Sequence, residues 1–234
     1  MKTAESVSQT VEEYLETIYN MSMEGEIVIG ARLAQKFGVA PPTVTETLKR
    51  LVRDGYVEMD SKRQVRLTEA GYQIAESVLR RHRLAERFLV DLLGMEWHQV
   101  HEEACRLEHV ISGKFEEQVI LNLKQPTTCP HGNPIPGLVP NARTYLSDCG
   151  AVRLSTLAPG ETATILLISE VVEDESALIL YLHQRGLTPG TRLTVVSQGR
   201  KLNPDDSEES VVLMVDGREV TIMKSVAPKI WVTR

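Results

Sequence analysis

The feature that most constrains the fold is a stretch rich in proline and glycine between Pro126 and Pro140. Proline lacks a backbone N–H and fixes φ, so this stretch can neither continue a helix nor lie in the middle of a sheet. Before it, apolar residues recur mostly at helical spacing, whereas after it they form short β-branched runs. We therefore predict a linker here, within a multi-domain α+β protein.

The first segment, residues 1–76, has the pattern of a winged helix-turn-helix DNA-binding domain. Apolar residues between Val11 and Tyr19 form one helical stripe. Two more helices are expected over 30–37 and from Pro41 to Gly55, followed by two strands over 56–60 and 64–67, with Thr68 able to cap the next helix. A β-hairpin that follows a helix-turn-helix is the wing of this fold.

The net charge of −6 argues against general coating of nucleic acid, but a small DNA-reading surface is compatible with it. Between Lys49 and Arg66, six basic residues stand against three acidic ones. Hydroxyl side chains on the third helix can reach base edges, and its cations suit phosphates. The predicted DNA contacts are Pro42, Thr43, Thr45, Thr47, Lys49 and Arg50, with Lys62 and Arg63 at the hairpin tip. The alternative is a winged helix used only for protein contacts.

The middle segment, expected as an all-helical domain over residues 77–145, carries metal-ligand residue types at helical spacing. A long helix is expected from Thr68 to about Leu93, and His82 and Glu86 lie four residues apart on it and therefore share a face. On the next helix, about 96–111, four ligand-type residues fall within an arc of roughly 100°: His101, Cys105, Glu108 and His109. Imidazole, thiolate and carboxylate together favour a transition metal over Ca²⁺. The alternative for a single His–Glu pair is a helix salt bridge.

The other cysteines are not predicted to bind metal. Cys129, His131 and Cys149 lie in or near the proline-rich stretch, and three scattered ligands do not make a credible zinc site. Three cysteines form an odd count, which favours a reduced protein. With no export signal and no apolar run long enough to span a bilayer, we expect a cytoplasmic protein without a membrane partner.

The last segment, residues 155–234, is predicted to be a small β-barrel. Five β-branched runs are expected as strands: 162–168, 192–196, 210–215, 219–222 and 229–232. A helix from Leu178 to Arg185, ended by Gly186, lies between the first two. Leu157-Ala-Pro-Gly160 and Gly186-Leu-Thr-Pro-Gly190 resemble the SH3-like (FeoA-type) domain of ferrous-iron-transport accessory proteins.

Nearly the whole chain resembles the diphtheria-toxin-repressor family of metal-dependent transcription regulators. The resemblance is carried by His82-Arg-Leu-Ala-Glu86-Arg-Phe-Leu, Val100-His-Glu-Glu-Ala-Cys-Arg-Leu-Glu-His109 and Gly132-Asn-Pro-Ile-Pro-Gly137, in the same order, and by Glu12-Glu13-Tyr14-Leu15-Glu16. It implies a homodimer with a winged helix, a helical dimerisation domain and an SH3-like domain. It also implies that Mn²⁺ or Fe²⁺ acts as corepressor, with two or more ions per protomer, and that loaded dimers bind palindromic double-stranded DNA operators.

The resemblance further implies two adjacent metal positions. One has His82, Glu86 and His101, completed by two side chains of the SH3-like domain, which spacing matches to Glu170 and Glu173. The other has Cys105, Glu108 and His109 with Glu13 of the first helix, and Glu16 matches a further ligand of manganese-responsive members. Cys105 is typical of iron-responsive members and Glu13 of manganese-responsive ones, so both ions stay open.

Two other classes of function are alternatives to a repressor. An enzyme is not expected, because the chain has no HExxH helix, nucleophile elbow or glycine-rich phosphate loop. A metal-storage or metal-delivery protein that uses the SH3-like domain is the alternative to a repressor, but it leaves the winged helix unexplained.

Overall fold

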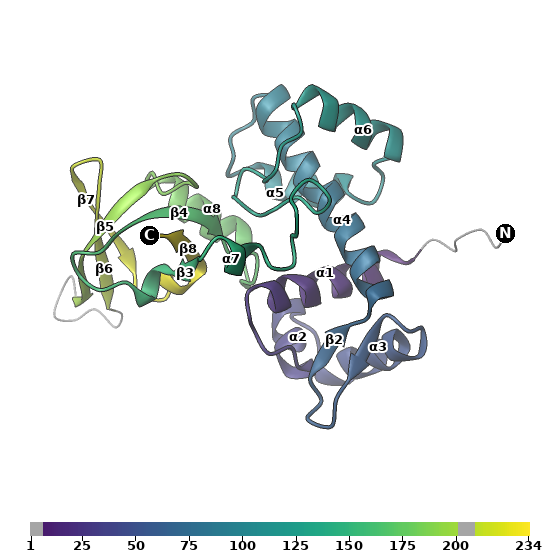
Figure 1. The fold of residues 1–234 in the computed structure, drawn as a ribbon. Helices are drawn as coiled ribbons and strands as arrows, with labels where there is room; N and C mark the ends of the chain where they lie inside the picture. Colours follow the sequence, from purple (N-terminus) through teal and green to yellow (C-terminus); the bar gives the residue numbers. More distant parts are fainter. Residues whose placement is uncertain (1–6, 201–208) are drawn as a thin grey trace.

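The computed structural model describes residues 7–200 and 209–234 and contains three structural units (Figure 1). The N-terminal unit and the helical unit are joined by the long helix α4 (Glu69–Arg87), and the β-rich unit lies beside both. The multi-domain α+β prediction is confirmed. None of the helices in the described ranges has the length and apolar character that a membrane span requires.

The N-terminal unit is the predicted winged helix-turn-helix. It consists of α1 (Gln9–Met23), α2 (Gly30–Phe37), α3 (Pro41–Arg53), β1 (Val57–Met59) and β2 (Val65–Leu67). Gly38 ends α2 with a φ of 62°, as its place in the pattern predicted. The Thr68 side chain accepts a hydrogen bond from the backbone N–H of Gly71 and caps α4. The apolar faces of all three helices close one core with the hairpin.

The helical unit differs from the sequence prediction in two places. The helix expected to reach Leu93 is α-helical only to Arg87 and continues as a π-helical turn, η1 (Phe88–Leu92). After α5 (Val100–Leu107), a further helix, α6 (Gly113–Asn122), packs on α4. The sequence prediction did not include α6, because only Val119 on it is fully buried and its apolar periodicity is weak.

The proline-rich stretch is irregular, as predicted, but it is more than a linker. All residues from 131 to 136 are buried between the helical and β-rich units. Ile168 donates its backbone N–H to the carbonyl of His131 at 2.9 Å, and Asn133 Nδ2 donates to the carbonyl of Ile168 at 3.0 Å. Gly132 has a φ of 88°, and a Cβ at this position would lie 2.1 Å from the carbonyl oxygen of Leu166. The stretch is therefore packed directly against the β-rich unit.

The β-rich unit is the predicted SH3-like barrel, with one additional short strand. It contains α7 (Tyr145–Asp148), β3 (Val152–Arg153), η2 (Leu154–Thr156), β4 (Thr162–Ile168), α8 (Glu175–His183), β5 (Arg192–Arg200), β6 (Ser210–Val215), β7 (Arg218–Met223), η3 (Ala227–Lys229) and β8 (Ile230–Thr233). The strand order is β3-β8-β4-β5-β6-β7 with antiparallel neighbours. Its apolar core is separate from that of the winged helix.

Polar contacts fasten the β-rich unit to the winged helix. Glu24, at the end of α1, is buried and accepts hydrogen bonds from Ser169 Oγ at 2.7 Å and Trp231 Nε1 at 3.2 Å. Lys36 Nζ on α2 donates to the backbone carbonyls of Glu170 at 3.2 Å and Val172 at 2.5 Å. The segment between β4 and α8 is thus held directly by the helix-turn-helix.

Candidate metal centre

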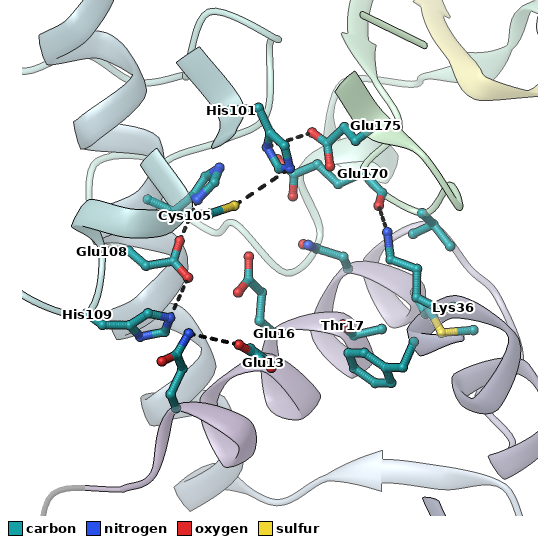
Figure 2. A pocket seen from close by; sticks show the side chains of 16 residues that line it. Glu13, Glu16, Thr17, Lys36, His101, Cys105, Glu108, His109, Glu170 and Glu175 are labelled. Carbon is teal, nitrogen blue, oxygen red and sulfur yellow. Dashed lines mark hydrogen bonds and ion pairs between the residues drawn. The ribbon is translucent and has the colours of Figure 1, made fainter. Parts of the chain in front are cut away.

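A cavity of about 290 Å³ lies where the three units meet (Figure 2). Its walls come from α1, the end of α2, α4, α5 and the segment from β4 to α8. Eight of its lining residues are metal ligands predicted from the sequence: Glu13, Glu16, His82, His101, Cys105, Glu108, His109 and Glu170. Glu175, which the sequence did not suggest, also lines it, whereas the predicted Glu86 and Glu173 do not. The helical spacing that suggested one ligand stripe therefore does aim these side chains into a common space.

His82 is the central side chain of this site. It is buried, with Nδ1 lying 2.5 Å from Glu108 Oε2 and Nε2 lying 3.2 Å from Glu86 Oε1. Burial alone would lower the pKa of His82, but attraction to Glu86 and contacts with Cys105 and Glu108 raise it well above its ordinary value. His82 belongs to two groups of ligand atoms that lie within 4.8 Å of one another, one with His101 and Cys105 and one with Glu16 and Glu108.

A third, fully buried group lies deeper and combines Glu86 with Cys129 and His131. His131 Nε2 donates to the backbone carbonyl of Trp97 at 2.9 Å, because a carbonyl can only accept. That bond leaves Nδ1 as the ligand atom, and it lies 3.0 Å from Glu86 Oε1. The interpretation that set Cys129 and His131 apart as scattered residues is therefore wrong about their position. Cys149 is exposed and belongs to none of the groups found among the described residues.

Unsatisfied polar atoms around Glu86 fit a bound cation. Glu86 Oε2, His101 Nδ1 and His131 Nδ1 are all buried and make no hydrogen bond of acceptable geometry in the structure. Buried polar atoms are almost always satisfied, so three unsatisfied ones around a single carboxylate need a proton or a metal ion between them. Imidazole, thiolate and carboxylate are the ligands that transition metals take.

Cys105 lines the cavity and is half-buried. Its Sγ is 3.7 Å from His101 Nε2. Burial raises the pKa of the Cys105 thiol, but hydrogen bonds from His101 and His82 outweigh burial and lower it below its ordinary value. A thiol with a lowered pKa is more readily present as the thiolate, which is the metal-binding form.

Three carboxylates on α1 face the site in different ways. Glu16 points into the cavity (Figure 2), where burial and the neighbouring Glu108 raise its pKa to about 8. Glu13 also lines the cavity, but its carboxylate accepts a hydrogen bond from Gln9 Nε2 at 3.0 Å. His109 Nδ1 contacts Glu12 Oε2 at 2.7 Å rather than Glu13. The described structure thus brings Glu16, and not Glu13, within ligand distance of His82 and Glu108.

The β-rich unit contributes Glu170 and Glu175. Glu170 is buried in an ion pair with Arg83, whose Nη2 lies 2.7 Å from Glu170 Oε2. Glu175 Oε1 lies 3.4 Å from His101 Nδ1. Glu173, which spacing had suggested, is exposed and accepts a hydrogen bond from Gln35 Nε2 at 2.7 Å. The turn that begins α8 decides which carboxylate faces the cavity, and sequence spacing does not reveal that turn.

The predicted DNA contacts lie on a separate surface. α3 and the β1–β2 hairpin are at the opposite end of the molecule from α6 (Figure 1). Pro42, Thr43, Thr45, Lys49, Arg50, Lys62 and Arg63 are exposed and Thr47 is half-buried. Lys49 Nζ lies 2.7 Å from Glu46 Oε1, so one of the cations is partly neutralised.

Comparison with known proteins gives a consistent result. Residues 6–65 match the N-terminal DNA binding domain of iron dependent repressors, residues 68–137 match their metal binding and dimerisation domain, and residues 152–234 match the FeoA domain. The chain is 41% identical over 191 residues to the iron-dependent repressor IdeR of Mycobacterium tuberculosis, covering 80% of this chain and 83% of that protein. The chain belongs to the iron-dependent repressor family.

Other members of the family are similar over more of the chain. The diphtheria toxin repressor of Corynebacterium diphtheriae is 33% identical over 222 residues, covering 93% of this chain and 94% of that protein. The solved structure of a manganese-dependent transcriptional repressor complex with manganese superposes with a TM-score of 0.76 at 29% identity, covering 95% of this chain and 99% of that one. The family consists of metal-dependent transcriptional repressors and not of enzymes, and these relatives do not favour a storage or delivery protein.

Proposed function

We propose that this family member is a homodimeric repressor that binds a palindromic operator when Mn²⁺ or Fe²⁺ occupies the cavity between its three units. The observation that carries the proposal is the position of the ligand groups. They lie where α1 of the winged helix, α4 and α5 of the helical unit and the β4–α8 segment face one another. A cation held there would fix the orientation of the DNA-binding unit.

Electrostatics explain why the metal-free and metal-bound forms would differ. Glu16 on α1 lies close to Glu108, which directly follows α5, and the two carboxylates repel each other unless a proton or a cation lies between them. A divalent ion would supply that positive charge and hold α1 close to α5. Lys36, on α2, ties the same region to the β4–α8 segment, so the helix-turn-helix is held from two sides.

We propose two or more ions per protomer. Glu86, Cys129 and His131 form one position, and Glu175 lies nearby through its contact with His101. The second position draws on His82 and the remaining ligand-type side chains: Glu13, Glu16, His101, Cys105, Glu108 and His109, with Glu170 at the wall. The geometry favours Glu175 over Glu173 as the carboxylate that α8 supplies.

The ligand chemistry allows both proposed ions. Carboxylates favour the harder Mn²⁺ and Fe²⁺, whereas Cys105 and Cys129 increase the preference for Fe²⁺ and softer ions. Affinity order by itself would favour Zn²⁺, Ni²⁺ or Cu²⁺, so the ion that acts as corepressor also depends on availability. Activity with Mn²⁺ and Fe²⁺ must therefore be compared directly.

The helical unit offers the surface for the dimer. Its exposed large apolar side chains are Leu92, Leu93, Val110, Phe115 and Leu121. Val110 is 75% exposed and Leu121 64%, and several exposed large apolar side chains on one unit favour a protein–protein contact there. A twofold contact through this surface would place two copies of α3 at a fixed spacing. Such dimers read half-sites about 34–36 Å apart or a multiple of this distance.

The proposal is tested by anaerobic titration with Mn²⁺ and Fe²⁺, read out as binding to the DNA upstream of the protein's own coding sequence. We expect binding only with metal. Glu86→Gln should abolish it, because Glu86 contacts His82, His101 and His131. Glu173→Gln is the matched control, since the Glu173 carboxylate hydrogen-bonds only to Gln35 among the described residues, and this variant should bind the DNA as the wild type does.

Recognition of the DNA base sequence is tested separately from metal binding. Thr43→Ala should relax base preference, whereas Lys62→Ala should weaken binding to all sequences and lower its salt dependence. Metal-independent binding by the wild type, or metal-stimulated binding of wild-type strength by Glu86→Gln, would contradict the proposed mechanism.

A further inference from the structure

A second surface carries metal-ligand residues outside the cavity. Glu96 and His98 lie in the loop between η1 and α5, and His183 is the last residue of α8. One ligand atom from each of the three lies within 4.8 Å of the others. None of these residues lines the cavity described above. The group therefore lies between the helical unit and the β-rich unit, outside the cavity.

The two histidines already lie side by side without an ion. The rings of His98 and His183 stack with centroids 4.0 Å apart and planes 25° apart. His98 Nδ1 is buried and has no hydrogen-bond partner. Glu96 is exposed and free to turn toward them, and both histidines are half-buried. Two neighbouring imidazoles and a carboxylate would supply three ligands and leave a coordination position open to water.

The chemistry of this group selects among cations. Two imidazole nitrogens and a carboxylate oxygen suit Zn²⁺, Ni²⁺, Co²⁺ or Cu²⁺, whereas Ca²⁺ and Mg²⁺ prefer sites made of oxygen. The absence of a thiol in the group separates it from the cysteine-containing groups of the cavity. The group is also not a cluster of surface carboxylates, because two of its three side chains are histidines.

Trp97 connects this group to the buried group of Glu86, Cys129 and His131. Its indole Nε1 donates to His183 Nδ1 at 2.8 Å, and its backbone carbonyl accepts from His131 Nε2 at 2.9 Å. While His183 Nδ1 accepts this bond, a neutral ring carries its proton on Nε2 and has no free lone pair. Binding of an ion by His183 must therefore release the indole N–H of Trp97, either directly or by a change of tautomer.

We propose that Glu96, His98 and His183 form an additional surface site for a borderline divalent cation such as Zn²⁺ or Ni²⁺. The ion clamps α8 of the β-rich unit to the loop that precedes α5. Its occupation breaks the hydrogen bond between Trp97 and His183 and opens the stacked rings. Because the Trp97 carbonyl holds His131, Trp97 links the surface site to the buried group of Glu86, Cys129 and His131. This proposal does not depend on the repressor function.

The test counts Zn²⁺ by equilibrium dialysis of the full chain and follows Trp97 fluorescence during Ni²⁺ addition. The fluorescence is measured in a Trp231→Phe background, because the chain has two tryptophans. The wild type should bind one more Zn²⁺ per chain than the double variant His98→Gln/His183→Gln. Ni²⁺ should quench the fluorescence of Trp97 more strongly when His98 and His183 are present than in the double variant. Glu117→Gln, an exposed carboxylate on α6, is the matched control and should behave as the wild type.

Equal Zn²⁺ counts for the wild type and the double variant would overturn the proposal, as would an equal response of Trp97. If the double variant fails to fold, Glu96→Gln decides, because an exposed side chain can be replaced without loss of packing. Glu96→Gln should weaken Zn²⁺ binding at the surface position at least tenfold, and a titration identical to that of Glu117→Gln would overturn the proposal.

Discussion

Replacement of Gly132 by alanine is the sharpest test of how the proline-rich stretch is packed. The new Cβ would lie 2.1 Å from the carbonyl oxygen of Leu166 and 2.8 Å from the Cα of Leu167, and both are backbone atoms that cannot rotate away. The backbone must separate by about 1 Å to restore an ordinary contact, which costs about 1–3 kcal/mol as overpacking. The φ of 88° adds about 1–3 kcal/mol for a residue with a side chain.

Gly132→Ala should therefore lower the free energy of unfolding by roughly 2–6 kcal/mol. Gly150→Ala is the matched control, because Gly150 also has a positive φ, 61°, but a Cβ there meets nothing within 4 Å. It should cost only the conformational strain, about 1–3 kcal/mol. Urea denaturation of both variants without metal measures the difference.

Metal affinity supplies the second readout for the same pair of variants. His131 precedes Gly132 and is held between Trp97 and Ile168, so separation of the stretch from β4 displaces a ligand of the buried group. A misplacement that costs 1.4 kcal/mol corresponds to about a tenfold loss of affinity. We expect Gly132→Ala to bind Zn²⁺ at least about tenfold more weakly than Gly150→Ala. Equal unfolding midpoints and equal affinities would refute the packing argument.

Three further predictions concern charge, assembly and coupling. The raised pKa of Glu16, about 8, means that the folded metal-free protein keeps a proton that the unfolded chain releases near 4.5, so stability should fall as pH rises between these values. Glu16→Gln should flatten this fall in urea denaturation. Leu93→Asp should produce monomers in sedimentation, whereas Leu180→Asp, on α8, should not. Lys36→Met removes hydrogen bonds to carbonyls of the β4–α8 segment and should weaken metal-stimulated DNA binding about tenfold in anisotropy titrations, with unchanged Zn²⁺ stoichiometry.

Local periodicity was enough to predict most of the fold. The winged helix, the long helix α4 and the strands of the barrel depend on apolar patterns and turn residues within single segments, such as Gly38 and Thr68. α6 was missed because most of its apolar side chains are not buried by the chain itself. Its apolar residues are spread over more than one face, with Val119 buried and Leu121 64% exposed, so no single apolar stripe marks the helix in the sequence.

The candidate metal ligands also fall into two sets, those that helical spacing predicts and those that only the packing of the chain brings to the site. His82, Glu86, His101, Cys105 and Glu108 were predicted from spacing on two helices, and the structure places them together. Cys129 and His131 were not, because the segment that carries them has no periodicity and only its packing against β4 turns it inward. The available indication was composition: Cys-Pro-His-Gly has two ligand types within three residues, next to a glycine. Glu175 likewise depends on where α8 begins.

The position of His82 has a consequence for the order in which metal ions would bind. One imidazole lies in two ligand groups, facing Glu86 with one nitrogen and Glu108 with the other. A ring nitrogen that has given its lone pair to one ion is no longer available to a second, and the opposite nitrogen keeps its proton in a neutral ring. The first ion to use His82 therefore changes the ligand set that the next ion meets. Loading should follow an order with unequal steps, and the response to metal need not be the simple saturation curve of independent sites.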